Sequence, residues 1–330
     1  MLNKKVSIVT GGAGFIGSHM VDLLIKKKHK VLVIDDLSKG KKKNIHHHIR
    51  NKDAILIKKN ILNITSKDIN FKKICFIFHF AGKDAIIPSI TNPEKYINVN
   101  LNGTLKILEA SKNLNFKKFV YAASSSCYGK AKTPTDENKK ISNLHPYALS
   151  KYLGEQLALS WHKIYDLPIN SVRIFNAYGE RIGFNNEYGA MFPILLKQKL
   201  SNKPLTIVGD GKQKRDFIYV KDLVQAFYAV ANIKNSGEIF NAGYGKPVSV
   251  NLIAKLIGGK KIFIKKRPGE PEITHSNIRK IKSFTNWKPK VSIKQGVEIM
   301  IRNINLWEDS VLWDKKKIKL ATKVWFNKLK

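Results

Sequence analysis

Short apolar runs alternate with segments of helical spacing through the first half of the chain. The apolar runs predict buried strands at 6–10, 31–35, 54–58, 75–80, 119–123 and 169–175. Between them, apolar residues recur at helical spacing over 15–28, 93–112 and 147–165. Short apolar strands that alternate with helices are typical of a parallel sheet covered by helices on both faces. The pattern therefore predicts an α/β fold built on a doubly wound parallel sheet.

The pattern loosens beyond residue 176, where glycine and proline mark turns at 209–211, 243–245 and 268–271. A loop-rich segment after a regular alternating half predicts a second, smaller lobe over the sheet. We therefore divide the chain into domains at 1–175 and 176–330, and we expect the second part to return to the sheet around 215–245. No apolar run approaches the roughly 18 residues that a membrane-spanning helix needs, so we expect no membrane insertion.

The net charge of +36 on 330 residues has two interpretations. One is a basic surface that binds nucleic acid or a membrane. The other is a composition biased toward Lys, which spreads the charge over every exposed face. Only seven of the 60 basic residues are Arg, and the Lys runs at 41–43 and 315–317 lack the interleaved aromatic residues of a strand-binding groove. We therefore favour compositional bias and expect no nucleic-acid partner.

The cysteine and histidine content predicts neither disulfides nor a metal site. Cys75 and Cys127 are the two cysteines, and both fall in or just after predicted strands. This usage fits a reduced cytosol, and a strand that begins near residue 6 leaves no room for a signal peptide. The run 46–48 is three histidines, with no acidic residue or Cys spaced to join it, so we interpret it as an exposed loop. We expect a cytoplasmic protein without a bound metal.

A glycine-rich turn follows the first predicted strand and opens the first predicted helix. The spacing of Gly12, Gly14 and Gly17 allows a tight turn and close approach of the backbone to a pyrophosphate. Free amides at the helix N-terminus then face the phosphates. Asp35 ends the second strand, where its carboxylate would hold the ribose hydroxyls and repel a 2′-phosphate. The turn predicts a Rossmann-like domain that binds NAD rather than NADP.

The strongest catalytic signal is the pair Tyr147 and Lys151, preceded by Ser124. On a helix, residues four apart share one face, so the ammonium of Lys151 would lie beside the phenol. We expect this cation to lower the pKa of Tyr147 from its ordinary value of about 10, which would make the phenol a usable base.

Two further polar residues leave alternatives open. His79 ends the fourth predicted strand, where it is either a packed strand-end residue or part of the site. Asn100 lies within a run of asparagines at 98–102, where it would either orient the pocket loop or stabilise a helix.

With these residues in hand, the chain resembles the extended short-chain dehydrogenase/reductase family, and within it the nucleotide-sugar epimerases and dehydratases, of the UDP-glucose and UDP-N-acetylglucosamine 4-epimerase type. The resemblance runs over nearly the whole length. It is carried by the glycine turn and by the segments 79–82, 123–129, 147–151, 173–179, 215–220 and 267–270.

The resemblance implies roles for individual residues. Ser124, Tyr147 and Lys151 would form the catalytic triad. The cofactor would be NAD, held by Gly11, Gly14, Phe15, Ile16, Gly17, Asp35, Asn60, Ile61, Phe80, Ala81, Asn100, Tyr147 and Lys151. The substrate would be a nucleotide sugar, bound by Ser124 of the sheet half and by five residues of the C-terminal lobe, namely Asn176, Arg215, Arg267, Glu270 and Thr274. Related proteins are commonly homodimers, so we expect a homodimer here.

Two departures from the family's pattern bear on the reaction. Asn60 stands where many members carry an Asp that binds adenine, and we expect weakened but surviving adenine recognition. Ser125 and Ser126 follow Ser124, where dehydratases and decarboxylases of the family usually carry an acidic residue. Without that acid, proton removal at carbon 5 of the sugar has no evident agent, so we expect simple 4-epimerisation through a 4-keto sugar.

Alternatives stay open for the role of Thr274 and for the activity of the protein. By resemblance, Thr274 lies beside the sugar's 2-substituent, where it is either a gate that leaves room for an N-acetyl group or an ordinary loop residue. A 4,6-dehydratase or UDP-glucuronate decarboxylase on the same scaffold is the alternative reaction. A non-catalytic NAD-binding regulator is the alternative of another class.

Overall fold

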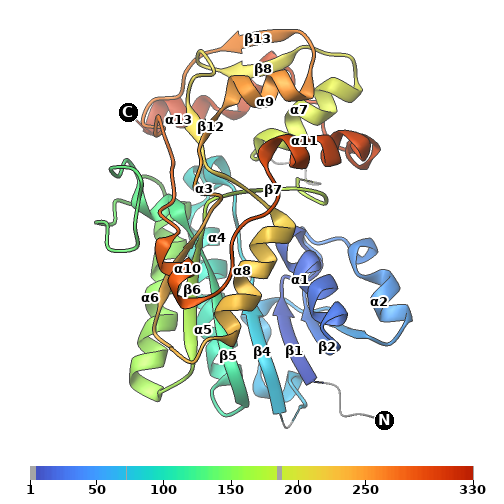
Figure 1. The fold of residues 1–330 in the computed structure, drawn as a ribbon, viewed down its shortest axis with the longest axis vertical. Helices are drawn as coiled ribbons and strands as arrows, with labels where there is room; N and C mark the ends of the chain where they lie inside the picture. The colour runs from blue at the N-terminus through green and yellow to red at the C-terminus, as the bar shows by residue number, and fades with distance from the viewer. Residues whose placement is uncertain (1–4, 72, 184–187, 330) are drawn as a thin grey trace.

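The computed structural model describes residues 5–71, 73–183 and 188–329, and its centre is a seven-stranded sheet. The strands run in the order β11-β6-β5-β4-β1-β2-β3, and every neighbouring pair is parallel (Figure 1). Their bounds are β1 Lys5–Thr10, β2 His29–Ile34, β3 Ala54–Ile57, β4 Lys73–His79, β5 Asn115–Ser124, β6 Ile169–Ile174 and β11 Ile239–Ala242. The doubly wound α/β fold is confirmed.

Both faces of the sheet are buried, because successive residues of each strand face opposite layers. In β1, Val9 packs with α1 (Phe15–Lys26) and α8 (Val220–Asn232) on one face. The neighbouring Ile8 packs with α5 (Gly103–Ser111) and α6 (Pro146–Tyr165) on the other. This two-sided burial is why the strands read as continuous apolar runs.

The helix expected over 93–112 is interrupted in the structure. It consists of α4 (Pro93–Ile97), a five-residue π-helical turn (Asn98–Asn102) and α5. Gly103 follows the turn at a close contact, since a Cβ there would lie 2.4 Å from Cδ1 of Ile61. Single π-helical turns inside helices are frequent at functional sites, and this one carries Asn100.

The remaining elements form the upper lobe and the edges of the molecule. The lobe has its own apolar core, which includes Trp307 and Met300. Its three strand pairs are β7–β10, β9–β12 and β8–β13. The strands are β7 Asn176–Tyr178, β8 Leu205–Val208, β9 Lys214–Arg215, β10 Phe217–Tyr219, β12 Val248–Ser249 and β13 Lys261–Ile264. The other helices are α2 His46–Arg50, α3 Ile86–Thr91, α7 Met191–Leu200, α9 Val250–Ile257, α10 Arg279–Phe284, α11 Ile293–Arg302, α12 Lys315–Ala321 and α13 Lys323–Lys328.

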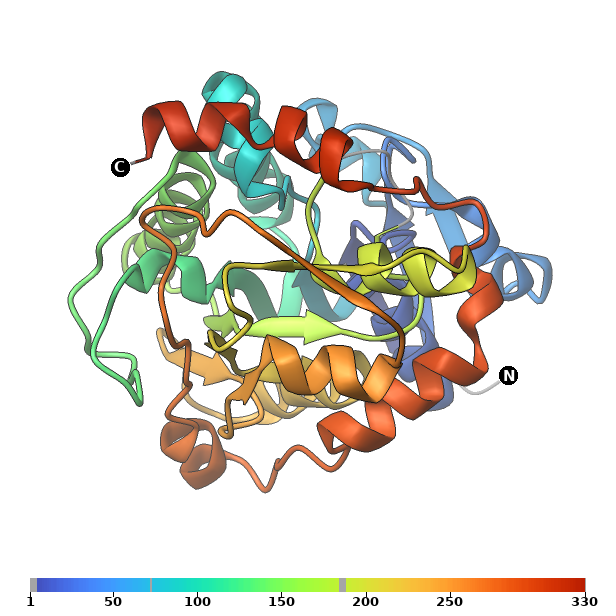
Figure 2. The same ribbon diagram turned by 90° about the horizontal axis from the view of Figure 1, so that it is seen from above.

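The chain crosses between the sheet and the lobe several times. It leaves the sheet after β6, returns through α8 and β11, and then builds α9 and β13 above. The C-terminal α13 packs against α3 of the sheet half, as the view from above shows (Figure 2). The lobe therefore lies over the carboxyl ends of the strands, where ligands bind in open parallel sheets. No helix in the described part of the chain is long and apolar enough to cross a membrane.

Candidate active site

A cavity of about 1360 Å³ lies between the carboxyl edge of the sheet and the upper lobe. Every predicted site residue except Asn100 lines it. This volume exceeds the 300–1,000 Å³ or so of an ordinary small-ligand pocket, and so has room for two large ligands side by side.

The glycine turn forms the floor of the cavity at the N-terminus of α1. Gly11 has a φ of +67°, and a Cβ there would lie 2.7 Å from the amide nitrogen of Ala81. A Cβ on Gly17 would lie only 2.1 Å from the carbonyl oxygen of Gly11. Gly14 is the N-cap of α1 and brings no side chain to the first amides of the helix. The turn is thus a bare backbone cradle, which fits the pyrophosphate of a dinucleotide.

Asp35 and Asn60 lie beside this cradle. The carboxylate of Asp35 accepts hydrogen bonds from the backbone N–H groups of Ala13 (2.9 Å) and Leu37 (2.8 Å), and burial raises its pKa. Asn60 accepts from the N–H of Leu62 at 2.9 Å and donates to Asp36 at 2.8 Å. Asn60 is therefore fixed in orientation by its own loop, and its contact with adenine stays a prediction.

His79 is a packed strand-end residue in the structure. It is 1% exposed, with Nδ1 2.7 Å from the hydroxyl of Thr10 and Nε2 3.0 Å from the hydroxyl of Thr104. Burial, with a smaller contribution from the charge of Lys151, lowers its pKa to about 3. The imidazole is therefore neutral and ties β1, β4 and α5 together beneath the cavity.

Asn100 does not reach the cavity wall. Its side-chain oxygen accepts from the N–H of Lys83 (2.7 Å), and its amide donates to the carbonyl of Lys83 (3.0 Å) and to the hydroxyl of Ser150 (2.8 Å). These hydrogen bonds stabilise the loop after β4. Of the two interpretations of this residue, the structure supports orientation of the pocket loop, and a direct cofactor contact is not supported.

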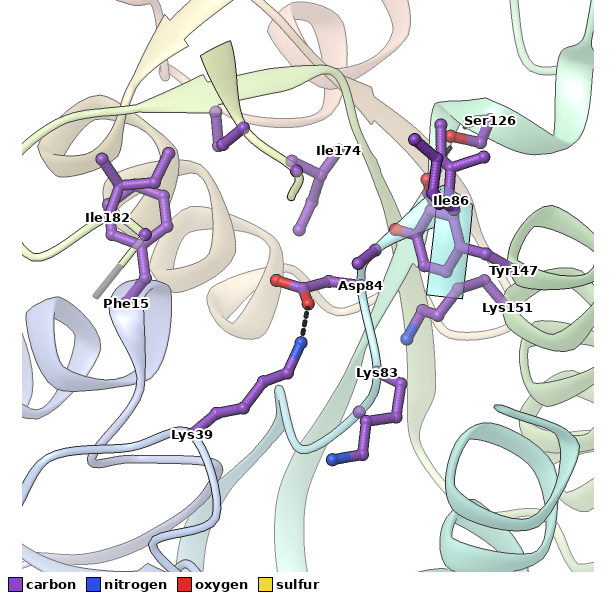
Figure 3. Close-up of a pocket in the computed structure, with 18 of the residues that line it drawn as sticks. Phe15, Lys39, Lys83, Asp84, Ile86, Ser126, Tyr147, Lys151, Ile174 and Ile182 are labelled. Atoms are coloured by element: carbon purple, nitrogen blue, oxygen red, sulfur yellow. Dashed lines mark hydrogen bonds and ion pairs between the residues drawn. The ribbon is translucent and has the colours of Figure 1, made fainter. Parts of the chain in front are cut away.

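Ser124, Tyr147 and Lys151 all line the cavity, and Tyr147 and Lys151 extend into it from the same helix (Figure 3). Ser124 ends β5, and its hydroxyl is hydrogen-bonded to the phenol of Tyr147. Tyr147 and Lys151 lie in the first turns of α6, which begins at Pro146 and is capped by the side chain of His145. The ammonium nitrogen of Lys151 lies 4.4 Å from the centre of the Tyr121 ring. These contacts hold the three groups in one place before any ligand arrives.

The expected direction of the Tyr147 pKa is wrong. Burial raises it to about 12, and the hydrogen bond with Ser124 only partly opposes this shift. Burial also lowers the pKa of Lys151 to about 8, against the opposing charges of Glu155 and Asp84. The cost of placing a phenolate in a desolvated site outweighs both the hydrogen bond from Ser124 and the charge of Lys39. The helical spacing of Tyr147 and Lys151 alone could not reveal this.

The lobe side of the cavity carries the predicted substrate residues. Arg215 is 8% exposed and pairs with Glu270 at 2.9 Å. The guanidinium of Arg267 donates to the hydroxyl of Tyr188 and lies over the rings of Tyr188 (5.3 Å) and Trp325 (5.7 Å). The two arginines are thus held as planar forks, the geometry that suits a diphosphate.

Asn176 and Thr274, which both line the cavity, are hydrogen-bonded to each other. The hydroxyl of Thr274 donates to the side-chain oxygen of Asn176 at 3.0 Å and accepts from the backbone N–H of Asp216 at 3.3 Å. The hydroxyl of Thr274 therefore already has both an acceptor and a donor partner within the protein.

The sequence reasoning missed the cavity residues Trp325 and Asp84. Trp325, near the C-terminus, holds Arg267 and donates to the carbonyl of Pro268 at 2.8 Å, and no local pattern signals this role. Lys39 and Asp84 form an ion pair of 2.7 Å between the loops after β2 and β4 (Figure 3). The position of Asp84 just after the segment 79–82 was the available signal, since that segment ends a strand at the sheet's carboxyl edge.

The histidine run at 46–48 also differs from expectation. These residues begin α2 rather than forming a loop. Asp22 of α1 lies against them, with its carboxylate oxygen Oδ1 2.8 Å from Nε2 of His48. The absence of an acidic partner nearby in sequence was therefore misleading, because the partner comes from another helix.

The comparisons with known proteins agree with this geometry. A model of the NAD dependent epimerase/dehydratase family matches residues 7–243. A putative UDP-glucose 4-epimerase of Methanocaldococcus jannaschii is 37% identical over 302 residues, which span 89% of this chain and 96% of that protein. The UDP-glucuronate 4-epimerase of Thermodesulfobacterium geofontis is 32% identical, over 96% of this chain and 98% of that protein.

Solved structures give the same picture. A UDP-glucuronic acid 4-epimerase from Bacillus cereus, in complex with UDP-glucuronic acid and NAD, superposes with a TM-score of 0.85 at 31% identity, over 91% of this chain and 99% of that one. With the glycine cradle, the Ser124–Tyr147–Lys151 group and the family match over most of the sheet half, the chain belongs to the NAD dependent epimerase/dehydratase family.

Proposed function

We propose that the protein is an NAD-dependent 4-epimerase of a nucleotide sugar of the UDP-glucose/UDP-galactose type, with N-acetylated sugars included. The observation that carries the proposal is the position of Ser124, Tyr147 and Lys151. They lie in one cavity between a pyrophosphate cradle on the sheet side and two held arginines on the lobe side. A hydroxyl on the substrate would therefore meet the phenol with both ligands anchored.

Each catalytic side chain has a distinct part in the proposed reaction. Tyr147 takes the proton of the sugar's 4-hydroxyl, and Ser124 donates a hydrogen bond to the same oxygen. Lys151 stays largely protonated near neutral pH, because its pKa of about 8 lies above that range, and its charge favours the phenolate. NAD, held against the cradle of Gly11, Gly14 and Gly17, would supply the reversible hydride chemistry at carbon 4.

Arg215 and Arg267 would anchor the diphosphate while the sugar turns over. Bidentate contacts from planar guanidinium groups fix the diphosphate without gripping the sugar itself. Glu270, already paired with Arg215, would accept a hydrogen bond from the nucleotide ribose. We propose that residues 1–175 form the NAD-binding domain and that 176–330 form mainly the nucleotide-sugar lobe.

The first experiment is to incubate the purified protein, without added NAD, with UDP-glucose, UDP-N-acetylglucosamine, UDP-glucuronate and dTDP-glucose. Proton NMR would resolve the products. We expect a 4-epimer from at least one UDP sugar. No conversion of any sugar, even with NAD supplied, would refute the epimerase and favour the non-catalytic regulator.

Decarboxylation is the second candidate reaction, because a UDP-glucuronic acid decarboxylase of Arabidopsis thaliana is 29% identical over 92% of this chain and 69% of that protein. The cavity positions just after Ser124 are Ser125 and Ser126, which supply no acid for proton removal at carbon 5. A UDP-pentose from UDP-glucuronate in the NMR assay would overturn simple epimerisation.

We further propose a cytoplasmic homodimer that packs through the helices after β4 and β5. Leu149, Ile164 and Tyr165 of α6 are 40%, 65% and 40% exposed, which leaves apolar surface on that helix for a second copy. Light scattering on the purified protein would test the dimer, and Ile164→Lys should shift it toward the monomer.

A further inference from the structure

Asp22, His47 and His48 bring three potential ligand atoms within 4.8 Å of one another, outside the cavity. Asp22 lies on the outward side of α1, and the two histidines lie on α2. The residues come from segments 25 positions apart and meet only because α2 packs beside α1. Two imidazoles and one carboxylate form the donor set that borderline divalent metals prefer.

The ligand atoms of the cluster lie close enough together to share one ion after a local adjustment of the side chains. Nε2 of His48 is 2.8 Å from Oδ1 of Asp22, and the rings of His47 and His48 are 3.7 Å apart between centres. Bonds of about 2.0–2.1 Å to a tetrahedral zinc place neighbouring ligand atoms about 3.3 Å apart. The Asp22–His48 contact would therefore have to open by only about half an ångström.

The site is open to solvent on one side. Asp22 and His48 are half-buried, whereas His47 is exposed. A cation can therefore enter, and water can complete its coordination.

Arg181 is the competitor for the same carboxylate. Its Nη1 lies 2.9 Å from Oδ2 of Asp22, on the oxygen that does not face His48. That nitrogen is buried without a well-aligned hydrogen bond, so the contact is mainly one of charge. Because Arg181 also lines the cavity, its guanidinium and a bound cation would compete electrostatically for Asp22.

We propose that Asp22, His47 and His48 form a binding site for a divalent transition metal of the zinc class, completed by water. The metal would cross-link α2 to α1. The loop that leads into α2 reaches the glycine turn, since the side chain of Asn44 and the backbone N–H of Lys41 both donate to the carbonyl of Ala13, at 2.9 Å and 3.0 Å. The site thus braces the cofactor side of the cavity without touching a ligand.

The test uses untagged protein, stripped with a chelator, dialysed and titrated with ZnCl₂ by calorimetry, with bound zinc counted by elemental analysis. We expect one zinc per chain and a higher Tm in its presence, because a ligand that binds only the folded state stabilises it. His47→Ala, His48→Ala and Asp22→Asn should each weaken binding by about tenfold or more.

The matched control is His46→Ala, which removes an exposed neighbour that is not part of the cluster. It should bind zinc like the unchanged protein, and Arg181→Gln should bind more tightly because the competing charge is gone. Circular dichroism and the Tm of each chelated variant show whether it is folded. Equal loss in His46→Ala and His48→Ala, or no stoichiometric zinc on the unchanged protein, would overturn the site.

Discussion

The two walls of the cavity, one on the sheet side and one on the lobe side, differ in whether backbone atoms or side chains give them their shape. The sheet wall is the glycine turn with Asp35 and the loop after β4, and backbone atoms make most of its shape. The lobe wall is Arg215, Arg267, Glu270, Thr274 and Trp325, and side-chain contacts between distant segments make its shape. A wall made of backbone tolerates few substitutions at its glycines, whereas a wall made of side chains is adjustable residue by residue.

The largest expected effect comes from the group between the two walls. Tyr147→Phe should lower kcat by about 10² to 10⁴-fold, because the proton acceptor is lost while both walls remain. The measurement is turnover by NMR together with the NAD content of the purified variant. NAD content should be unchanged, and near-normal turnover would exclude Tyr147 as the base.

Adding a methyl group to a glycine of the sheet wall should abolish cofactor binding. In Gly17→Ala the new Cβ would lie 2.1 Å from the carbonyl oxygen of Gly11, so the turn must deform. We expect loss of bound NAD and destabilisation of roughly 2–4 kcal/mol. Gly189→Ala on the cavity rim, where nothing lies within 4 Å, is the matched control and should keep both. Retained NAD in Gly17→Ala would contradict a backbone cradle.

Because Lys151 is buried between the two walls, its shifted pKa should make the free energy of unfolding depend on pH. Its folded pKa of about 8 lies below the ordinary 10.5, so the folded state binds its proton less tightly than the unfolded state does. The resulting cost is fully present below about pH 8 and is relieved as the pH rises toward 10.5. Relative to Lys151→Met, the unchanged protein should therefore gain up to roughly 3 kcal/mol of stability across that window.

Urea unfolding of both proteins at several pH values is the measurement for Lys151. The Met variant is the reference because all other titrating groups are shared. A stability difference that does not change between pH 8 and 10.5 would mean that burial leaves the lysine unperturbed.

The lobe wall should respond in substrate affinity alone. Trp325→Ala removes the ring beside Arg267 and should raise the KM for the nucleotide sugar by about tenfold, with NAD content unchanged. Trp325→Phe keeps an aromatic face and loses only the hydrogen bond to Pro268, so it should recover most of the affinity. Loss of NAD in either variant would contradict the assignment of cofactor binding to the sheet wall and of substrate binding to the lobe wall.

The smallest effect is expected at Thr274, a single side chain of the lobe wall. Thr274→Tyr fills space beside the sugar and should reduce activity on UDP-N-acetylglucosamine several-fold more than on UDP-glucose. Kinetics on both sugars provide the measurement. Equal loss on the two would make Thr274 an ordinary loop residue rather than a gate.

Much of the sheet half could be predicted because its signals are local. Six strands, the glycine turn and the residues Ser124, Tyr147 and Lys151 follow from patterns that span a few residues each. The interrupted helix at 93–112 was missed because Asn100 is committed to the loop at Lys83, a contact that spacing along one helix does not encode.

The parallel sheet and the pyrophosphate cradle could be inferred from the chain's pattern, because apolar periodicity and glycine spacing act within single elements, and the family followed from a resemblance of several short segments. The folded arrangement was needed for the direction of the Tyr147 pKa, the aromatic support of Arg267 by Trp325 and the contact of Asp22 with His48. Desolvation and long-range contacts set these features, and both depend on which distant segments the folded chain packs together.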